Sequence, residues 1–492
     1  MLTRGTSFPG KMTFQSGENK EKAMTRPVSY QHSKHLCVIA AAILVAHTMN
    51  FGALGIAAVL VYIPYALSRP AFAIAMVILV LSVMPPVPRS VGWEEIIFCL
   101  TFATAIGRWF FPFCKNPRIP ATPVTGTSLA FLGLAIASIL PASLAGTPMS
   151  LWFRGIAPFL TFTIFIPALN DLKTKEARRV IVTALFLSGG MFAVQILMVI
   201  PQAWMPASTT SHWIALRAKL PANAFQPAIL AAGSFCVGQL ALPPSQIHRR
   251  YILWFIFLTA AISLTFLRSM ILILAILGFL AVMINFYMNP YIIPRVLGKG
   301  IKLVAMLAVC FAVSLFIPAV LNFYLLVFKT FTMRFGTGEY SYLESGRYLE
   351  WGAILKLAGS TDLWRLVTGW GLGKKITFFH IYLGKELTYG YTHCILSYIL
   401  LTTGCIGYAF FGALTLSTAA LMKHAAFTVP RDELPVFYGF SAALVSMMMY
   451  AMLQSVFRHF GFNVLAAVLL ASIAQMYTTT FRSPEKESPC AE

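Results

Sequence analysis

Long runs of apolar residues, separated by short polar connections, dominate the chain from about residue 36 to residue 479. A membrane-spanning helix needs about 20 mostly apolar residues. By that measure we predict spans near 36–50, 53–67, 70–84, 94–113, 126–142, 152–169, 179–201, 224–242, 249–266, 268–288, 302–326, 392–422, 434–455 and 459–479. The first three runs are short and crowded, so the pattern predicts an all-α polytopic membrane protein with about 12–14 transmembrane helices.

A single long polar stretch, residues 327–392, interrupts this pattern. Long connections tend to be functional or disordered, and this one carries too many aromatic residues for disorder. We expect it to be a large external loop that contains short helices. The chain then divides into a basic N-terminal tail (1–35), a transmembrane array (36–326), the loop (327–392), C-terminal transmembrane helices (393–479) and a tail (480–492).

The charge distribution supports this topology. Hydrophobic residues make up 58% of the chain and charged residues only 11%, with a formal net charge of +21. Lys and Arg concentrate in alternate connections, as expected for segments that face the cytoplasm. We therefore place both termini in the cytoplasm and the large loop outside, and we expect no nucleic acid partner. The basic connections include Lys115/Arg118, Lys173/Lys175/Arg178/Arg179, Arg249/Arg250, Arg295/Lys299/Lys302 and Lys423/Arg431.

Cysteine spacing argues against a disulfide or metal-binding framework, and the polar N-terminus argues against a cleaved signal peptide. Most of the eight cysteines lie inside apolar runs without a C-x-x-C pair, which is typical of buried thiols rather than of disulfides or metal ligands. The outward segments also lack H-x-x-H and D-x-D patterns. We expect no cofactor and no metal site. The N-terminus does not resemble a cleaved signal peptide, so the first apolar run should remain as an anchor.

Arg268 interrupts an apolar run that extends from Tyr251 to Asn289. One helix of this length would span about 57 Å, whereas the hydrocarbon core of a membrane is about 30 Å thick. The run should therefore form two helices with a tight outer turn close to Arg268. A charge inside such a run is a functional candidate. The alternative is that Arg268 extends its guanidinium to the outer headgroups.

Further candidates lie in the other outward segments. Arg217 and Lys219 belong to the connection 202–223, where they are either substrate ligands or ordinary solvated charges. In the large loop, Ser345 is a plausible helix cap, after which Arg347, Trp351 and Leu355 share one helix face. Such a helix would lie flat on the outer membrane boundary.

Two features mark the end of the large loop. The turn Gly369–Gly373 lacks the strand–turn–helix setting of a dinucleotide site and is interpreted as a tight bend that brings the loop back. His393 follows Tyr391 where the chain re-enters the membrane, and is either a catalytic base or a capping or packing residue. His380 and His459 are interpreted as packing residues. Arginine and histidine without carboxylate clusters favour an anionic substrate, because guanidinium groups match phosphate geometry.

The order of these features resembles the bacterial O-antigen ligase and polymerase superfamily, which includes exopolysaccharide polymerases. The resemblance covers roughly residues 210–415. It rests on Arg217 in an outer loop, Arg268 at a span junction, S-G-R-x-x-x-W (Ser345, Gly346, Arg347, Trp351), G-x-G (Gly371, Gly373), His393, and the sequence Gly404-Cys405-Ile406-Gly407. Two positions depart from the family: Cys394 replaces a frequent Asn, and Ser269 replaces a frequent Gly.

The resemblance implies a metal-independent inverting glycosyltransferase of the bacterial inner (cytoplasmic) membrane. Its donor would be an oligosaccharide on undecaprenyl pyrophosphate at the periplasmic face, and its acceptor a glycan or lipid A-core. Arg217, Arg268 and Arg347 would bind pyrophosphate or donor sugar, and Lys219, Trp351 and Tyr391 would support them. His393 would be the general base or the group that orients the acceptor. Membrane lipids and other polysaccharide assembly proteins are the further partners expected.

Several alternatives stay open at this point. The motifs do not separate a polymerase for O-antigen or exopolysaccharide, our first expectation, from an O-antigen ligase. A secondary transporter or lipid flippase would carry polar sites near the bilayer midplane, whereas the unusual charges here collect at one outer face. A scaffold subunit without chemistry would leave those charges unexplained.

Overall fold

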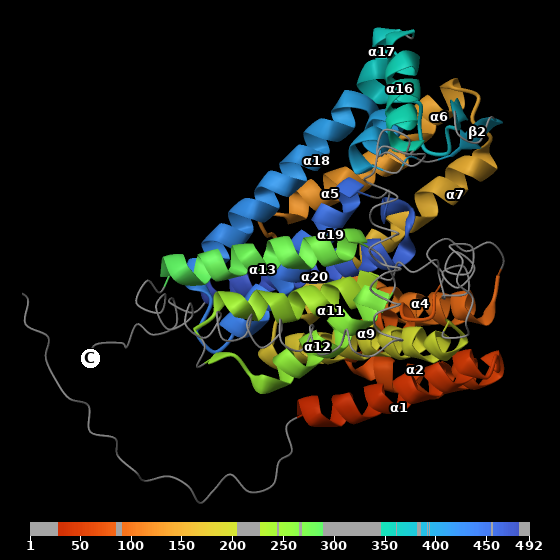
Figure 1. The fold of residues 1–492 in the computed structure, drawn as a ribbon. Helices are drawn as coiled ribbons and strands as arrows, with labels where there is room; N and C mark the ends of the chain where they lie inside the picture. The colour runs from red at the N-terminus through yellow and green to blue at the C-terminus, as the bar shows by residue number, and fades with distance from the viewer. Residues whose placement is uncertain are drawn as a thin grey trace, which may run out of the picture.

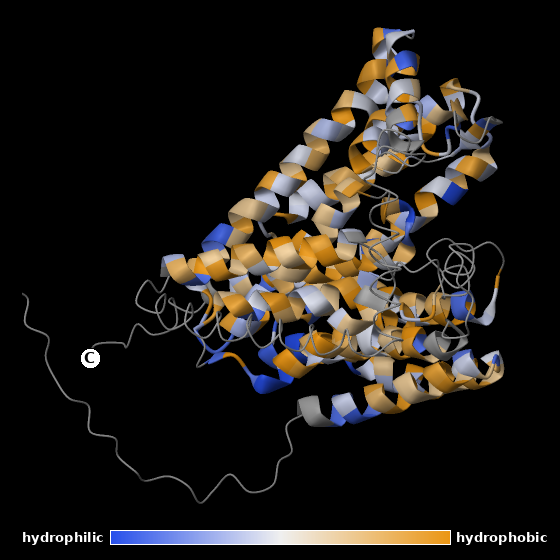
Figure 2. Ribbon diagram, viewed as in Figure 1, coloured by the Kyte–Doolittle hydropathy of each residue, from blue (hydrophilic) through white to orange (hydrophobic). Residues whose placement is uncertain are grey.

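The computed structural model describes residues 28–84, 91–203, 227–243, 246–264, 268–288, 346–360, 362–380, 385–390, 392, 394–453 and 456–481. Within these ranges the chain is mostly helical, and its helices pack side by side along much of their lengths (Figure 1). Apolar residues predominate along the packed helices, and hydrophilic residues gather near several helix ends (Figure 2).

The helices of the first part follow the predicted apolar runs closely. They are α1 (Val28–Thr48), α2 (Gly52–Ser68), α3 (Pro70–Val80), α4 (Trp93–Lys115), α5 (Thr125–Ala137), α6 (Ile139–Leu144), α7 (Met149–Leu160), the 3₁₀ helix η1 (Thr161–Ile164), α8 (Phe165–Asp171), α9 (Lys175–Ala203), α11 (Pro227–Gly238), η3 (Gln239–Ala241), α12 (Arg249–Leu264) and α13 (Arg268–Met288).

The later elements begin inside the large loop. They are α16 (Gly346–Gly359), α17 (Leu363–Thr368), the strands β1 (Ile376–His380) and β2 (Lys385–Tyr389), then α18 (Ile395–Thr428), α19 (Leu434–Leu453), η7 (Val456–Arg458) and α20 (Phe460–Phe481). The predicted run 302–326 lies outside the described residues, as do residues 1–27 and 482–492. Helix α1 begins at Val28, inside the stretch predicted as the N-terminal tail (1–35).

Eight helical stretches among the described residues are long and apolar enough to cross a membrane. They are Trp93–Lys115, Thr125–Leu144, Met149–Asp171, Lys175–Met198, Ser269–Tyr287, Ile395–Thr428, Leu434–Leu453 and Phe460–Thr479. Shorter apolar helices cover Gly52–Ser68, Pro70–Val80 and Pro227–Ala241. The expected class, a mostly helical polytopic membrane protein, is confirmed, while the total of 12–14 spans stays a prediction.

The apolar run around Arg268 forms two helices, as its length predicted. Helix α12 ends at Leu264 and α13 begins at Arg268. Both helices pack against α11, whose described side chains are all buried. The long apolar run is therefore two neighbouring helices, because one helix would exceed the thickness of the membrane.

Helices α3, α11 and α20 form the interior of the bundle. Almost every side chain of α20 from Phe462 to Met476 is buried, and α20 contacts α8, α18 and α19. A helix that is apolar on all sides is stable only when other helices surround it or when lipid does. Helix α20 is thus enclosed by helices that precede it in the sequence.

Ion pairs gather several connections at one end of the bundle. Arg108 on α4 contacts Asp171 at the end of α8, with 2.9 Å between Nη1 and Oδ2. Lys175 pairs with Asp432, and Arg178 pairs with Glu433, joining the start of α9 to the connection before α19. We call this end, defined by Arg108, Asp171, Arg178 and Glu433, the ion-paired end. Two of the connections that the charge pattern assigned to the cytoplasm, those of Lys173/Lys175/Arg178/Arg179 and of Lys423/Arg431, lie at this end.

The described part of the large loop contains a β-hairpin that the sequence analysis missed. Strands β1 and β2 pair antiparallel, with Ile376 opposite Tyr389 and Phe378 opposite Leu387. Ile376 and Phe378 are buried whereas Thr377 and Phe379 are exposed, which is the two-residue period of a strand. Five residues per strand are too few to stand out beside long apolar runs. The loop is therefore helical and β-stranded rather than purely helical.

Candidate functional site

The described residues between 346 and 390 fold into a small unit that we call the loop cap: α16, α17, the turn Gly369–Gly373 and strands β1 and β2. Figure 1 shows α16, α17 and β2 together at one end of α18, near α6 and α7. The cap has its own core, in which α16 packs on β1 and the start of α18. That core consists of Ile354, Trp370, Ile376, Phe378, Leu400 and Leu401.

The glycine turn docks on a break in α18. Gly404 has φ 63° and ψ −154°, a conformation outside the helical region that is open essentially to glycine alone. Carbonyl groups next to a helix break need donors from elsewhere. The Trp370 N–H donates to the Leu401 carbonyl at 2.9 Å, and the Gly371 N–H donates to the Thr402 carbonyl at 2.9 Å.

Gly371 also lies against the backbone of α6. Its φ is 83°, and a Cβ placed there would be 2.4 Å from the Ala142 nitrogen. Gly373, two residues later, lies beside Leu151 at the start of α7. The turn is therefore wedged between α6, α7 and α18. This agrees with its interpretation as a tight bend, and it ties the cap to the transmembrane helices.

Four of the predicted site residues, Arg217, Lys219, Tyr391 and His393, lie outside the described residues. Arg268 is the first residue of α13, and Arg347 is the second residue of α16. Their positions in the fold are thus helix N-termini, where the backbone N–H groups favour negative charge. The meeting of the arginines and His393 in one cleft stays a prediction.

Trp351 is partly buried and packs against the core of the cap. The predicted face of Arg347, Trp351 and Leu355 is not the most buried one. Leu355 is 58% exposed, whereas Glu350 and Ile354 are buried. The helix packs on β1 with a neighbouring face because the hairpin, unrecognised in the sequence, provides the apolar surface there.

The two neighbours of His393 are held in place by hydroxyl groups. Thr392 is fully buried, and its Oγ1 donates to the Cys394 carbonyl at 3.0 Å. The Ser397 Oγ lies 2.8 Å from Thr392 Oγ1 and 2.9 Å from the same carbonyl oxygen. The backbone on both sides of residue 393 is therefore fixed to the first turn of α18. Sequence reasoning missed Thr392 and Ser397, although hydroxyl residues at a helix start are a recognisable signal.

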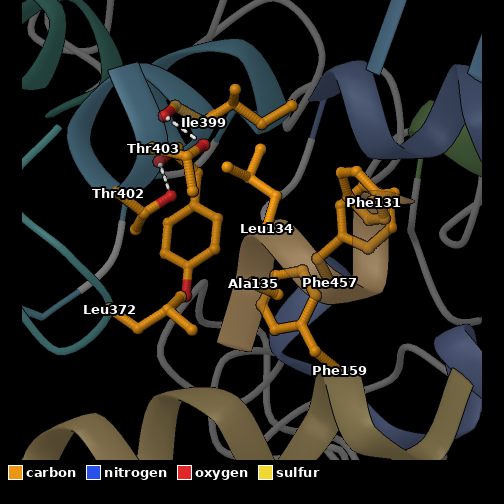
Figure 3. A pocket seen from close by; sticks show the side chains of 10 residues that line it. Phe131, Leu134, Ala135, Phe159, Leu372, Ile399, Thr402, Thr403 and Phe457 are labelled. Carbon is orange, nitrogen blue, oxygen red and sulfur yellow. Dashed lines mark hydrogen bonds between the residues drawn. The ribbon is translucent and has the colours of Figure 1, made fainter. Parts of the chain in front are cut away.

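An apolar pocket lies between the glycine turn and the transmembrane helices (Figure 3). It is lined by Phe131, Leu134, Ala135, Phe159, Leu372, Tyr398, Ile399, Thr402, Thr403 and Phe457. The hydroxyls of Thr402 and Thr403 donate to carbonyls one turn back, at 2.7 Å and 3.1 Å. The lining is thus mostly apolar, and both threonine hydroxyls already donate within α18.

Arg458 and His459 follow the pocket residue Phe457 in the connection between α19 and α20. The amide of Asn463 donates to the Phe457 carbonyl at 2.7 Å and to the Pro158 carbonyl at 2.8 Å, which fixes this connection against α7. Burial, together with the nearby charge of Arg458, lowers the pKa of His459 to about 3. The ring is therefore neutral, and the packing interpretation of His459 fits its surroundings.

The described surface of this end is basic. Exposed cations include Arg154 on α7, Lys356 on α16 and Lys375 before β1. Arg365 donates to the Leu144 carbonyl at 3.3 Å and links α17 to the end of α6. Exposed carboxylates of the cap are Asp362 and Glu386. Within the described ranges there is no group of three or more side chains able to hold a metal ion.

No protein-family model matches the chain, and no curated protein is similar enough in sequence to serve as a relative. The likeness to the O-antigen ligase and polymerase superfamily therefore rests on its sequence motifs alone.

Proposed function

We propose that this chain is a membrane glycosyltransferase that moves a glycan from undecaprenyl pyrophosphate to an acceptor sugar at the periplasmic face, in the polymerisation of O-antigen or exopolysaccharide. The observation that carries the proposal is the folded loop cap, fastened to the start of α18 beside the position of His393. It lies at the end of the α7–α8 stretch away from the ion-paired end, since Leu151 contacts the cap and Asp171 contacts Arg108.

In this proposal the reaction is a direct displacement. An acceptor hydroxyl attacks the anomeric carbon of the donor sugar, and the bond from that carbon to the pyrophosphate oxygen breaks. The hydroxyl proton passes to His393, since an imidazole has an ordinary pKa of about 6.5 and is neutral at physiological pH. Undecaprenyl pyrophosphate leaves as the second product.

The arginines stabilise the charge of the leaving group. Arg217, Arg268 and Arg347 bind pyrophosphate or donor sugar through paired N–H donors. Arg268 and Arg347 stand at the N-termini of α13 and α16, so the backbone of each helix adds a favourable dipole. Lys219, Tyr391 and Trp351 support the site, and the cap limits competition from water.

The direct test is transfer in vitro by the purified full-length chain in lipid nanodiscs. The probe is a synthetic undecaprenyl pyrophosphate-linked repeat unit with a matching glycan acceptor, assayed with EDTA present. We expect a ladder of longer glycans from the wild type and none from His393→Ala. The matched control is His424→Ala, because His424 is exposed at the other end of α18. Wild-type protein that releases no undecaprenyl pyrophosphate would contradict the proposal.

Arginine variants test how the charge is recognised. Arg268→Ala and Arg347→Ala should abolish transfer, and lysine at either position should restore it only in part, because an ammonium makes no paired contact. Arg431→Ala, in the connection before α19, is the control. Full activity of both alanine variants would remove these arginines from the mechanism.

Ligase and polymerase differ in their acceptors. Deletion of the gene should leave single-repeat glycan on lipid A if the protein polymerises O-antigen, or remove a secreted polymer alone if it builds exopolysaccharide. Loss of all glycan from lipid A would assign the protein as a ligase instead.

A further inference from the structure

We propose that Gly371 and Gly404 are positioning residues, which fasten the loop cap to the first segment of α18 and so hold Thr392 and Cys394, the described neighbours of residue 393. The inference deepens the proposed function and rests on it for the role of His393. The fastening itself is independent of that role and has its own measurement.

The first segment of α18 is fixed at both of its ends. At its start, Ser397 holds Thr392 and Cys394 on either side of residue 393. At its end, Leu401 and Thr402 accept the backbone hydrogen bonds of Trp370 and Gly371. Between these points lie fewer than three helical turns, so a shift at one end is passed to the other.

The contact between the glycine turn and the end of the first segment of α18 leaves no room for a side chain at either glycine. A Cβ at Gly371 would lie 2.4 Å from the Ala142 nitrogen, and a Cβ at Gly404 would lie 2.5 Å from the Val367 carbonyl oxygen. Ordinary contacts of this kind begin at 3.4 Å. Because backbone atoms make these contacts, no side-chain rotation relieves them, and the cap and α18 would have to separate by about 1 Å. Misplacement of a catalytic group by about 1 Å costs about 100-fold in rate.

The fold provides matched controls. Gly352 on α16 and Gly412 in the later part of α18 have open space around them and no positive φ. Alanine at these positions adds the same atom to the loop cap and to α18 without contacting a neighbouring residue. They separate the effect of the fastening from the general effect of replacing a glycine.

The experiment compares Gly371→Ala and Gly404→Ala with Gly352→Ala and Gly412→Ala in nanodiscs. With the synthetic lipid-linked donor, we expect kcat to fall about 100-fold in the first pair, with KM for the donor changed by less than about threefold. Hydrogen exchange of the peptide that contains Trp370 and Gly371 should be faster in the first pair and unchanged in the controls. Wild-type kcat in Gly371→Ala and Gly404→Ala would overturn the positioning role.

Two further readouts keep the inference testable. If a glycine variant fails to accumulate, Ser397→Ala removes the hydroxyl contact without adding bulk, and Ser397→Thr should restore kcat. If the wild type transfers no glycan, the proposed function fails, while hydrogen exchange still decides the fastening. Equal exchange in the wild type and in Gly404→Ala would overturn the fastening.

Discussion

The hydroxyl of Tyr408 donates a hydrogen bond of 2.8 Å to the carbonyl oxygen of Leu396, although the two residues are 12 positions apart on α18. In a straight helix that separation is about 18 Å along the axis, beyond the reach of a tyrosine side chain. The contact exists because the chain turns at Gly404, so that the later part of α18 folds back toward the first segment. The Tyr408 hydrogen bond therefore stabilises the bend in α18.

Tyr408→Phe should lower the stability of the protein without changing its fold. The substitution removes one hydrogen bond in an apolar setting, so we expect a loss of about 1 kcal/mol. Thermal unfolding in nanodiscs, followed by intrinsic fluorescence, measures the change as a lower Tm. Tyr287→Phe is the control, since Tyr287 is 85% exposed. Equal Tm values for the two variants would show that the hydrogen bond between Tyr408 and Leu396 contributes nothing to stability.

Glu433 and Asp432 are neighbours with different surroundings, and their removal should have different costs. Arg178 is 2% exposed and is bonded to Glu433 at 2.5 Å, so Glu433→Ala leaves a buried charge without its partner and should cost about 3 kcal/mol. Asp432 is exposed and pairs with Lys175. The hydrogen bond from Lys175 lowers the pKa of the Asp432 carboxyl group. Asp432→Ala should cost less than about 1 kcal/mol. Thermal unfolding of both variants, side by side, tests this order.

Acid should destabilise the protein partly through His459. Its folded pKa of about 3 lies below the ordinary value of 6.5, so the unfolded chain binds the proton more readily. The contribution of neutral His459 to the free energy of unfolding is complete above pH 6.5 and is lost as the pH falls toward 3. Between pH 7 and pH 5 we expect a loss of up to about 2 kcal/mol. A smaller decline of Tm over this range in His459→Asn than in His424→Asn would support the assignment; equal slopes would contradict it.

The orientation of the bundle can be measured by cysteine labelling. In a variant without the native cysteines, Lys375→Cys reports on the loop cap and Arg431→Cys on the ion-paired end, since both residues are exposed. We expect a membrane-impermeant maleimide to label Lys375→Cys in intact spheroplasts and Arg431→Cys only after permeabilisation. The reverse pattern would place the cap in the cytoplasm and exclude a periplasmic site.

The sequence predicted the helices well because a membrane imposes a length and a composition on each span. The division at Arg268 followed from length alone. The hairpin was missed because β1 and β2 are short, and because their partner surface on α16 is invisible in the sequence. The Arg178–Glu433 pair joins residues 255 positions apart, which no local pattern encodes.

The candidate site was predicted less completely. The glycine turn was identified as a bend, but its attachment to α18 depends on contacts with Ala142 and Thr402 that only the folded chain brings together. Thr392 and Ser397 were overlooked because each is an ordinary polar residue until both are found beside the same carbonyl. For Arg217, Lys219, Tyr391 and His393, the site stays a prediction from motif order.

The burial of α20 has a consequence for biosynthesis. Helix α20 leaves the ribosome after the helices that enclose it, so those helices enter the membrane before their common core is present. Until Phe460 and the residues after it are inserted, α8, α18 and α19 face lipid or one another along surfaces meant for α20. Packing of α8, α18 and α19 is therefore completed only once α20 has been inserted, and a chain that stops short of this helix should be a substrate for membrane proteases.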